Sequence, residues 1–123
     1  MKKLQALLFA FICIVAISCR HRHGNIDINY HESDKYYSMD AYFNKNQTRE
    51  VDEYMDRRIG RKSNVSFKNS RIDGTITLDD HTSFYIKKSP GVLKIKLDKN
   101  DNSNESYHEI KSMCIGIKKV LAK

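Results

Sequence analysis

The chain of 123 residues carries 22 Lys and Arg against 15 Asp and Glu, a formal net charge of +7. A chain of this length predicts a single domain, and its one Pro excludes a Pro-rich linker protein. This moderate positive charge, without a recognised nucleic-acid-binding motif, does not indicate a protein that binds nucleic acid.

The first 18 residues have the layout of a secretory signal peptide. Lys2 and Lys3 give a positive start, and the stretch 4–17 that follows contains Gln5 as its only clearly polar side chain. At roughly 1.5 Å per residue, a helix of this stretch would cover about 21 Å, less than the ~30 Å hydrocarbon core of a bilayer. We therefore expect residues 1–18 to be cleaved rather than to span the membrane.

The segment Ala16-Ile17-Ser18-Cys19 resembles the lipobox of bacterial lipoproteins, in which a small residue precedes an invariant Cys. Ala16 departs from the pattern, because Leu is commonest at that position. The resemblance implies cleavage between Ser18 and Cys19, a diacylglycerol on the sulfur of Cys19, and acylation of the new N-terminus. Two or three acyl chains would hold the protein durably at a bilayer. An ordinary signal peptide cut near Ser18, with Cys19 as a free thiol, is the alternative.

The resemblance also implies a location in the cell. Arg20 follows Cys19, whereas lipoproteins retained in the inner membrane usually carry Asp at that position. We therefore expect an anchor in the outer membrane, on its periplasmic face, with residues 19–25 as the lipidated Cys and a tether. Cys114 would then be the only other thiol of the processed chain, so no intramolecular disulfide is expected.

Residues 26–123 predict one small domain. Apolar and polar side chains alternate over 26–30 and again over 37–43, as in a hairpin with one buried face. Thr48 is the expected N-cap of a helix over 48–59. The apolar stripe of this helix comprises Val51, Tyr54, Met55 and Ile59.

Further strands follow this helix. The segments 75–78, 84–86 and 93–97 alternate in the same way, and the shorter pattern of Val65 and Phe67 indicates another short strand. The sequence Ser89-Pro90-Gly91 is typical of a type II turn. The lysines of the last strand, Lys94 and Lys96, predict a solvated sheet face, with a protected sheet edge as a second interpretation.

A second helix is expected to run to the C-terminus. Asn102 is its expected N-cap, with Glu105 three residues later, and Cys114 lies on its apolar stripe as a small buried residue. Gly116 lies inside the helix, which close approach to the sheet would explain. Together these elements predict an α+β fold: an antiparallel sheet of about five strands with two helices packed on one face, in the order ββα-ββ(β)α.

Two groups of side chains raise the question of metal binding or catalysis. His21 and His23 are too few for a closed zinc site, and a basic tether near anionic headgroups is the interpretation we favour. Asp79, Asp80 and His81 combine groups that a hydrolase uses, but a β-turn favours the same residue types. No catalytic or phosphate-binding motif is present, so we expect no catalytic residue, no metal, no cofactor and no enzymatic activity.

Two surfaces are candidate sites for a partner. One is a basic cluster at the end of the first helix and in the loop after it, although positive charge also stabilises a helix end by itself. The other is a set of tyrosines on the sheet face opposite the core, which are common in interfaces but also explained by cross-strand pairing. The basic cluster comprises Arg57, Arg58, Arg61, Lys62, Lys68 and Arg71, and the tyrosines are Tyr36, Tyr42 and Tyr85.

The stretches TLDDHTSFYIKKSPGVLKIKLDK and ESYHEIKSMCIGIKKVL resemble small lipoproteins of Bacteroidetes-type bacteria. That resemblance covers less than half of the chain and implies no activity and no functional residue. We expect a membrane-anchored envelope lipoprotein that binds an envelope protein, without catalysis and without a small-molecule substrate. The alternative is a periplasmic inhibitor or immunity protein that blocks a protease, lysozyme or toxin with the loop 61–71 or 89–91.

Overall fold

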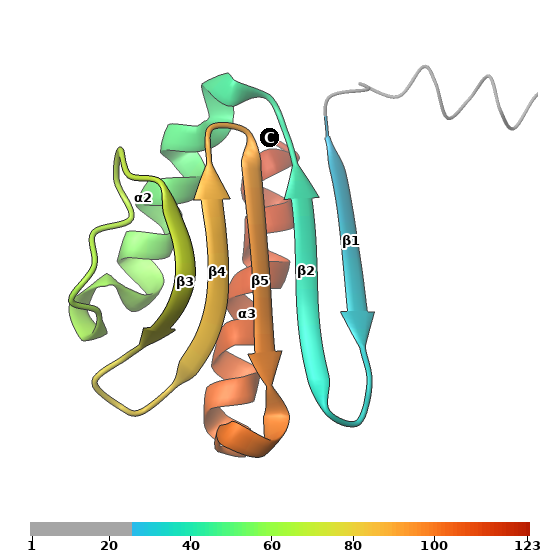
Figure 1. Ribbon diagram of the computed structural model, residues 1–123. Coiled ribbons are helices and arrows are strands. Elements are labelled where there is room, and N and C mark those ends of the chain that lie inside the picture. Colours follow the sequence, from blue (N-terminus) through green and yellow to red (C-terminus); the bar gives the residue numbers. More distant parts are fainter. Residues whose placement is uncertain (1–25) are drawn as a thin grey trace, which may run out of the picture.

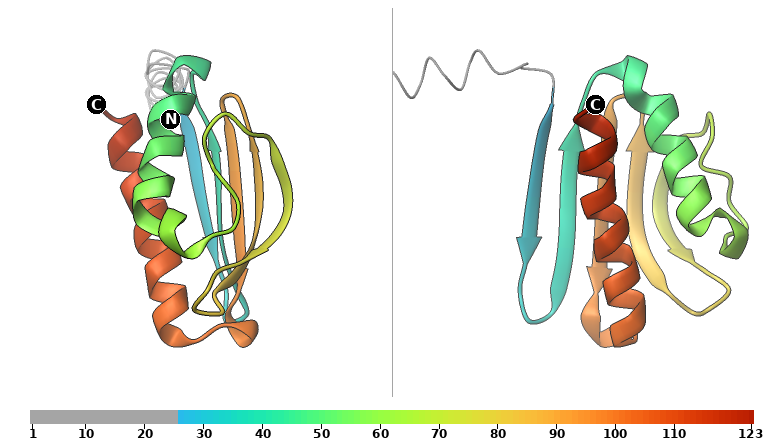
Figure 2. Two further views of the ribbon diagram at one scale, coloured as in Figure 1. Left: turned by 90° about the vertical axis from the view of Figure 1, so that its left-hand side faces the viewer. Right: turned by 180° about the vertical axis from the view of Figure 1, so that it is seen from behind.

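The computed structural model describes residues 26–123. Its centre is a five-stranded sheet in the order β1-β2-β5-β4-β3, in which neighbouring strands are antiparallel (Figure 1). Both long helices cover the same face of the sheet (Figure 2), which confirms the predicted α+β class. The strands are β1 (Asp27–Glu32), β2 (Tyr36–Tyr42), β3 (Ile72–Thr77), β4 (Ser83–Ser89) and β5 (Val92–Asp98). The helices are α2 (Thr48–Ile59) and α3 (Asn104–Leu121), with short 3-10 turns η1 (Lys45–Gln47), η2 (Gly60–Lys62) and η3 (Lys99–Asp101).

The core lies between the helices and the sheet. Alternate residues of a strand point to opposite faces, so the burial of Leu93, Ile95 and Leu97 places Lys94 and Lys96 on the helix-free face. The apolar stripes of both helices meet the inward strand residues in one continuous cluster. Each large side chain buried there contributes about 1.5–3 kcal/mol.

The central position of β5 corrects one sequence interpretation. This strand pairs with β2 on one side and with β4 on the other. Lys94 and Lys96 therefore do not protect a sheet edge, and that interpretation was wrong. A row of alternating lysines indicates a solvated face, but it carries no information on the neighbouring strands, because strand pairing joins residues far apart in the chain.

The turn between β4 and β5 contains Pro90 and Gly91, with Ser89 opposite Val92. Gly91 has a φ of +76°, which the second central residue of a type II turn requires. A Cβ at this position would lie 2.8 Å from the carbonyl oxygen of Phe43. The N–H of Phe43 in turn donates to the carbonyl oxygen of Gly91 (2.9 Å), so the turn also holds the end of β2.

Both predicted helix caps are wrong. Thr48 is the first residue of α2, and its Oγ1 accepts a hydrogen bond from the N–H of Gly91 (2.9 Å). Ser103 caps α3 by accepting a hydrogen bond from the N–H of Ser106 (3.0 Å). The side chain of Asn102 instead bonds the backbone at the start of β4 and the end of β5. Both expected caps therefore have tertiary partners, which spacing along the chain cannot reveal.

The segment 63–71 is a loop, so the predicted short strand at Val65 and Phe67 is wrong. Phe67 is fully buried, and its N–H donates to Oδ1 of Asp56 in α2 (3.4 Å). Val65 remains 38% exposed. A single buried aromatic residue that anchors a loop produces the same short apolar pattern as a strand.

Gly116 allows α2 and α3 to pack closely. A Cβ at Gly116 would lie 1.7 Å from the hydroxyl oxygen of Tyr54. The prediction that Gly116 allows close approach to the sheet is wrong, because the atoms nearest to this position belong to Tyr54 of α2. Any side chain at position 116 would need Tyr54 to move, because the end of its ring occupies that space.

Candidate binding surfaces

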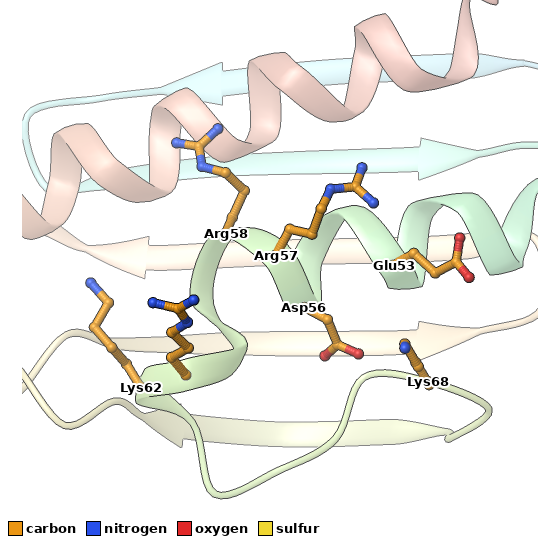
Figure 3. Close-up of a pocket in the computed structure, with 7 residues that line it drawn as sticks. Glu53, Asp56, Arg57, Arg58, Lys62 and Lys68 are labelled. Atoms are coloured by element: carbon orange, nitrogen blue, oxygen red, sulfur yellow. The ribbon is translucent and has the colours of Figure 1, made fainter.

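The residues of the basic cluster come from three successive segments. Arg57 and Arg58 lie in the last turn of α2, and Arg61 and Lys62 belong to η2. Lys68 and Arg71 lie on the loop that leads to β3. Figure 3 shows the groove between α2 and this loop, which has a volume of about 1090 Å³. It is lined by Glu53, Asp56, Arg57, Arg58, Arg61, Lys62 and Lys68.

Arg58 has partners inside the molecule. Its guanidinium donates to the hydroxyl of Tyr54 (2.6 Å) and to Oγ of Ser112 in α3 (3.1 Å). Figure 3 shows this side chain reaching toward α3. Arg58 therefore joins the two helices, and this structural role accounts for its position.

Lys62 also has internal partners. Its Nζ lies 2.9 Å from Asp80 Oδ2 and 2.7 Å from Glu109 Oε2, so it joins η2 to the β3–β4 turn and to α3. Hydrogen bonds to Glu109 and Asp80 raise the pKa of Lys62. The same contact with Lys62 lowers the pKa of Asp80 to about 2. This triad is partly exposed, so it contributes modestly to stability but holds the turn in place.

Arg57, Arg61 and Lys68 are the cations of the groove that remain available to a partner. All three are exposed, and none of them forms an ion pair with another residue of 26–123. The guanidinium of Arg57 lies over the ring of Tyr54, with its Cζ 5.9 Å from the ring centroid. The groove therefore presents three cations that are unpaired within the described chain, beside the carboxylates of Glu53 and Asp56, toward the C-terminal end of α2.

Arg71 does not belong to this groove. It lies in a second hollow of about 400 Å³, between the start of α2 and the β4–β5 turn, with Lys45, Arg49 and Lys88. The six cations that the sequence grouped together therefore divide into two internal linkers, three cations of one groove and one residue of another. The prediction grouped them because they are close in sequence. In the structure, the loop 63–71 runs past α2 and places Arg71 directly before the start of β3.

An ion pair that the sequence pattern did not reveal lies beneath the second hollow. Lys88 Nζ lies 3.0 Å from Asp52 Oδ1, and both side chains are almost fully buried. This oxygen has no well-aligned hydrogen bond, so the contact is one of charge more than of hydrogen-bond geometry. A signal was present in the sequence: Lys88 occupies the inward register of β4 after Phe84 and Ile86.

Tyr36, Tyr42 and Tyr85 lie on the helix-free face of the sheet, where alternation places them. They do not form one patch, because Tyr36 and Tyr42 lie at opposite ends of β2 and Tyr85 lies on β4. Each has a polar neighbour: Lys96 lies over the ring of Tyr36 (4.4 Å), Lys94 lies over Tyr42 (5.6 Å), and Tyr85 donates to an aspartate of β3 (2.7 Å). Cross-strand pairing therefore accounts for their positions.

The turn with Asp79, Asp80 and His81 is exposed. The carboxylate of Asp80 forms an ion pair with Lys62. Its Oδ1 also accepts a hydrogen bond from the N–H of Thr82 (3.1 Å). His81 has a φ of +70°, a backbone conformation found mainly in turns. These contacts support the turn interpretation of the three residues over a catalytic one.

A second network, also missed, surrounds Glu32 at the end of β1. Its carboxylate accepts hydrogen bonds from Lys99 Nζ (2.8 Å), Lys111 Nζ (3.2 Å) and the hydroxyl of Tyr107. Hydrogen bonding, with Lys99 the largest contribution, lowers the pKa of Glu32 to about 2. The network fastens the edge strand β1 to η3 and α3.

Cys114 is buried, as predicted, and burial raises the pKa of its thiol to about 12. Among residues 26–123, no group of three or more His, Cys, Asp and Glu side chains is arranged to hold a metal ion. In the same part of the chain, no helix is long and apolar enough to cross a bilayer. The predicted cleavage site at Ser18 and Cys19, the lipid attachment at Cys19 and the histidines His21 and His23 lie outside the described residues.

Comparisons with known proteins add no functional assignment. No protein-family model, no curated protein and no solved structure matches this chain.

Proposed function

We propose that the protein is a lipid-anchored envelope lipoprotein whose domain binds another envelope protein without catalysing a reaction. The lipobox-like segment that ends at Cys19 supports the anchor. The observation that carries the binding role is the groove along α2, where Arg57, Arg61 and Lys68 are exposed and lack ion-pair partners within residues 26–123.

The chemistry of the groove defines the partner. Three free cations beside Glu53 and Asp56 give a net positive surface, which attracts acidic side chains of a protein and speeds the encounter. Arginine is favoured in such contacts, because its planar guanidinium binds a carboxylate through two hydrogen bonds. The partner would therefore present an acidic segment to the end of α2.

The anchor is tested on the native protein. Mass spectrometry of the processed chain should show cleavage before Cys19 and an added diacylglycerol with a further acyl chain. Cys19→Ala should lose these masses and leave the membrane fraction. A native chain without acyl mass, with Cys19 as a free thiol, would remove the anchor from the proposal.

The groove is tested by crosslinking in the intact envelope. Replacing Arg57, Arg61 and Lys68 by Gln should remove the main crosslinked protein or reduce its yield several-fold. A matched control, Lys35→Gln with Asn100→Asp and Asn104→Asp, lowers the net charge by the same amount at exposed positions far from the groove. An unchanged set of partners in the groove variant would exclude this surface.

The inhibitor or immunity role is the second candidate, and the loop 63–71 is the feature that favours it. Phe67 anchors this loop in the core while Val65 remains exposed, so the loop offers an apolar side chain on a fixed base. The turn 89–91 is too tight to protrude into an active site. A one-to-one complex with a periplasmic hydrolase or toxin that Val65→Asp abolishes would favour this role over the first.

A further inference from the structure

At one end of the molecule, the start of the described chain lies near a turn, a helix start and the C-terminus. Figure 1 shows the start of β1, the start of α2, the β4–β5 turn and the C-terminus at this end. Hydrogen bonds join these parts: Gln47 Nε2 donates to the carbonyl oxygen of Leu121 (3.2 Å), and the N–H of Gly91 donates to Thr48 Oγ1 (2.9 Å). We call this end the anchor pole, because residue 26 leads from it to the expected tether.

The anchor pole is rich in exposed cations. They come from η1, from the first turn of α2, from the end of the loop before β3 and from the last turn of α3 and the residues after it. Asp27, Glu50 and Asp73 are the nearby exposed acids, and Arg49 pairs with Glu53 of the same helix (3.4 Å). The cations are Lys45, Arg49, Arg71, Lys118, Lys119 and Lys123.

The opposite end has the reverse character. It holds the β1–β2 turn, the β3–β4 turn and the start of α3 (Figure 1). Two of its lysines, Lys62 and Lys99, neutralise carboxylates of the same end, and Lys35 in the β1–β2 turn is a further exposed cation. The exposed carboxylates at this end that form no ion pair with another residue of 26–123 are Asp34, Asp79, Asp101 and Glu105.

An apolar hollow of about 510 Å³ lies within the anchor pole. Ile26, Ile28 and Leu121 line it, together with Lys118 and Lys123. Ile26 is 38% exposed. Apolar side chains bordered by lysines suit the boundary between headgroups and acyl chains, because lysine stems lie along apolar surface while the ammonium stays in the polar layer.

The chain length limits how the domain can face a bilayer. Between Cys19 and Ile26 the chain can extend at most about 25 Å. Helix α3 has 18 residues and is about 27 Å long, so the tether is shorter than the long dimension of the domain. The anchor pole therefore stays near the surface, whereas contact by the opposite pole would need the tether to run along the whole domain.

We infer that the anchor pole contacts anionic lipid headgroups, with the β-strands pointing away from the membrane and the Glu32 end farthest from it. This inference rests on the anchor at Cys19 proposed above. Anionic headgroups attract the lysines and arginines of one pole and repel the acids of the other, and this difference sets the orientation. The groove along α2 and the helix-free sheet face then lie sideways, open to a partner in the envelope.

The test uses the processed full chain in phosphatidylcholine vesicles with and without phosphatidylglycerol. A fluorophore is attached at Ala122→Cys in the anchor pole or at Asn100→Cys at the opposite end, and a headgroup-linked nitroxide quenches it. Both positions are exposed, and the buried Cys114 does not compete for the label. We expect several-fold stronger quenching at residue 122 than at residue 100, and a larger difference when phosphatidylglycerol is present.

Two variants with the same change of net charge separate the surfaces. Lys118→Gln with Lys119→Gln and Lys123→Gln should abolish the effect of phosphatidylglycerol on quenching at residue 122. The groove variant, with Arg57, Arg61 and Lys68 replaced by Gln, should retain it. Equal quenching at both positions, or quenching at residue 122 that phosphatidylglycerol does not change, would overturn the inference.

Mass spectrometry of the same sample separates this inference from the proposed anchor. If Cys19 carries no acyl mass, the anchor fails, and unlabelled protein is then sedimented with the same vesicles. Binding to phosphatidylglycerol vesicles that the Lys118, Lys119 and Lys123 variant loses would support the basic pole by itself. Absence of such binding would overturn the basic pole together with the anchor.

Discussion

Asp52 and Lys88 place two charges in the core, and their side chains are 4% and 3% exposed. Removing an ion from water costs several kcal/mol, so the attraction within such a pair returns little net stability. The pair matters because each charge depends on the other. It also joins the start of α2 to the end of β4, where the inward register would otherwise hold an apolar residue.

Removing one partner of this pair should lower the free energy of unfolding far more than replacing both partners with apolar residues. Lys88→Met leaves Asp52 buried without a counterion, so we expect a loss of about 3–5 kcal/mol in the free energy of unfolding. The double variant Asp52→Leu with Lys88→Met removes both charges and should be more stable than Lys88→Met alone. Urea denaturation of the unsubstituted protein, Lys88→Met, Asp52→Leu and the double variant measures this. A double variant that loses the sum of the two single effects would contradict the coupling.

At the scale of elements, the contact between α2 and α3 depends on Tyr54 and Gly116. The hydroxyl of Tyr54 is held by Arg58 (2.6 Å), and both Arg57 and Arg58 lie over its ring. The ring therefore cannot turn away freely when the facing helix gains a side chain. This packing explains why the helix keeps a glycine in its interior, which costs about 1 kcal/mol relative to alanine.

Gly116→Ala should destabilise the protein even though alanine is the better helix former. Overpacking costs about 1–3 kcal/mol and the gain in propensity is about 1 kcal/mol, so we expect a net loss of up to roughly 2 kcal/mol. In a Tyr54→Ala background the same substitution should be neutral or stabilising. Thermal or urea unfolding of the four proteins gives the comparison, and an equal cost in both backgrounds would exclude the contact as the cause.

The network around Glu32 predicts sensitivity to acid at the β1 edge. The folded-state pKa of Glu32 is about 2, below its ordinary value of 4.5, so the stabilisation is complete above about pH 5 and is lost as the pH falls toward 2. Asp80 also contributes stability that is lost as the pH falls toward 2, because Lys62 lowers its pKa to about 2. The urea concentration at the unfolding midpoint should therefore decrease as the pH is lowered from about 5 to about 2.

The variant Glu32→Gln should show a smaller fall over this range, because it lacks the titrating group. Glu50→Gln is the matched control, since Glu50 is exposed and forms no ion pair with another residue of the described chain. Hydrogen exchange should also quicken in β1 of Glu32→Gln at neutral pH. An acid response identical to that of the unsubstituted protein would show that Glu32 does not hold the edge strand.

At the scale of the whole molecule, one continuous core joins all five strands to both helices, with β1 packed at its margin through Ile28. Such a core predicts all-or-none unfolding. The chain has no Trp, so its near-ultraviolet circular dichroism reports the tyrosines, of which Tyr37 is buried and Tyr54 and Tyr107 pack against the core. We expect this signal and the far-ultraviolet signal to share one urea midpoint. Two separate midpoints would show that unfolding is not all-or-none.

The sequence predicted the elements well because their signals are local. Alternation in β2 and β5, the helical stripes, and Pro90 with Gly91 all depend on neighbours within a few residues. Polar residues with distant partners were predicted poorly. Thr48 and Asn102 suit helix caps equally well, yet each bonds backbone from another part of the chain.

The candidate site divides in the same way. Composition identified the cations, and alternation placed Tyr36 and Tyr85 on the open face. Neither could separate Arg58 and Lys62, which bind inside the molecule, from Arg57 and Arg61, which do not. That difference depends on α3 and the β3–β4 turn, which supply the partners.

The sequence by itself determined the α+β class, the inward face of most strands and helices, and the lipobox-like segment, because periodicity and short motifs are properties of neighbouring residues. Only the tertiary structure decided the strand order, the buried pair of Asp52 and Lys88, and the separation of a basic pole from an acidic one. These features depend on segments that are distant in sequence and meet only when the sheet closes and the helices pack on it. The charge of a surface is therefore a property of the fold, although each charge is a property of a residue.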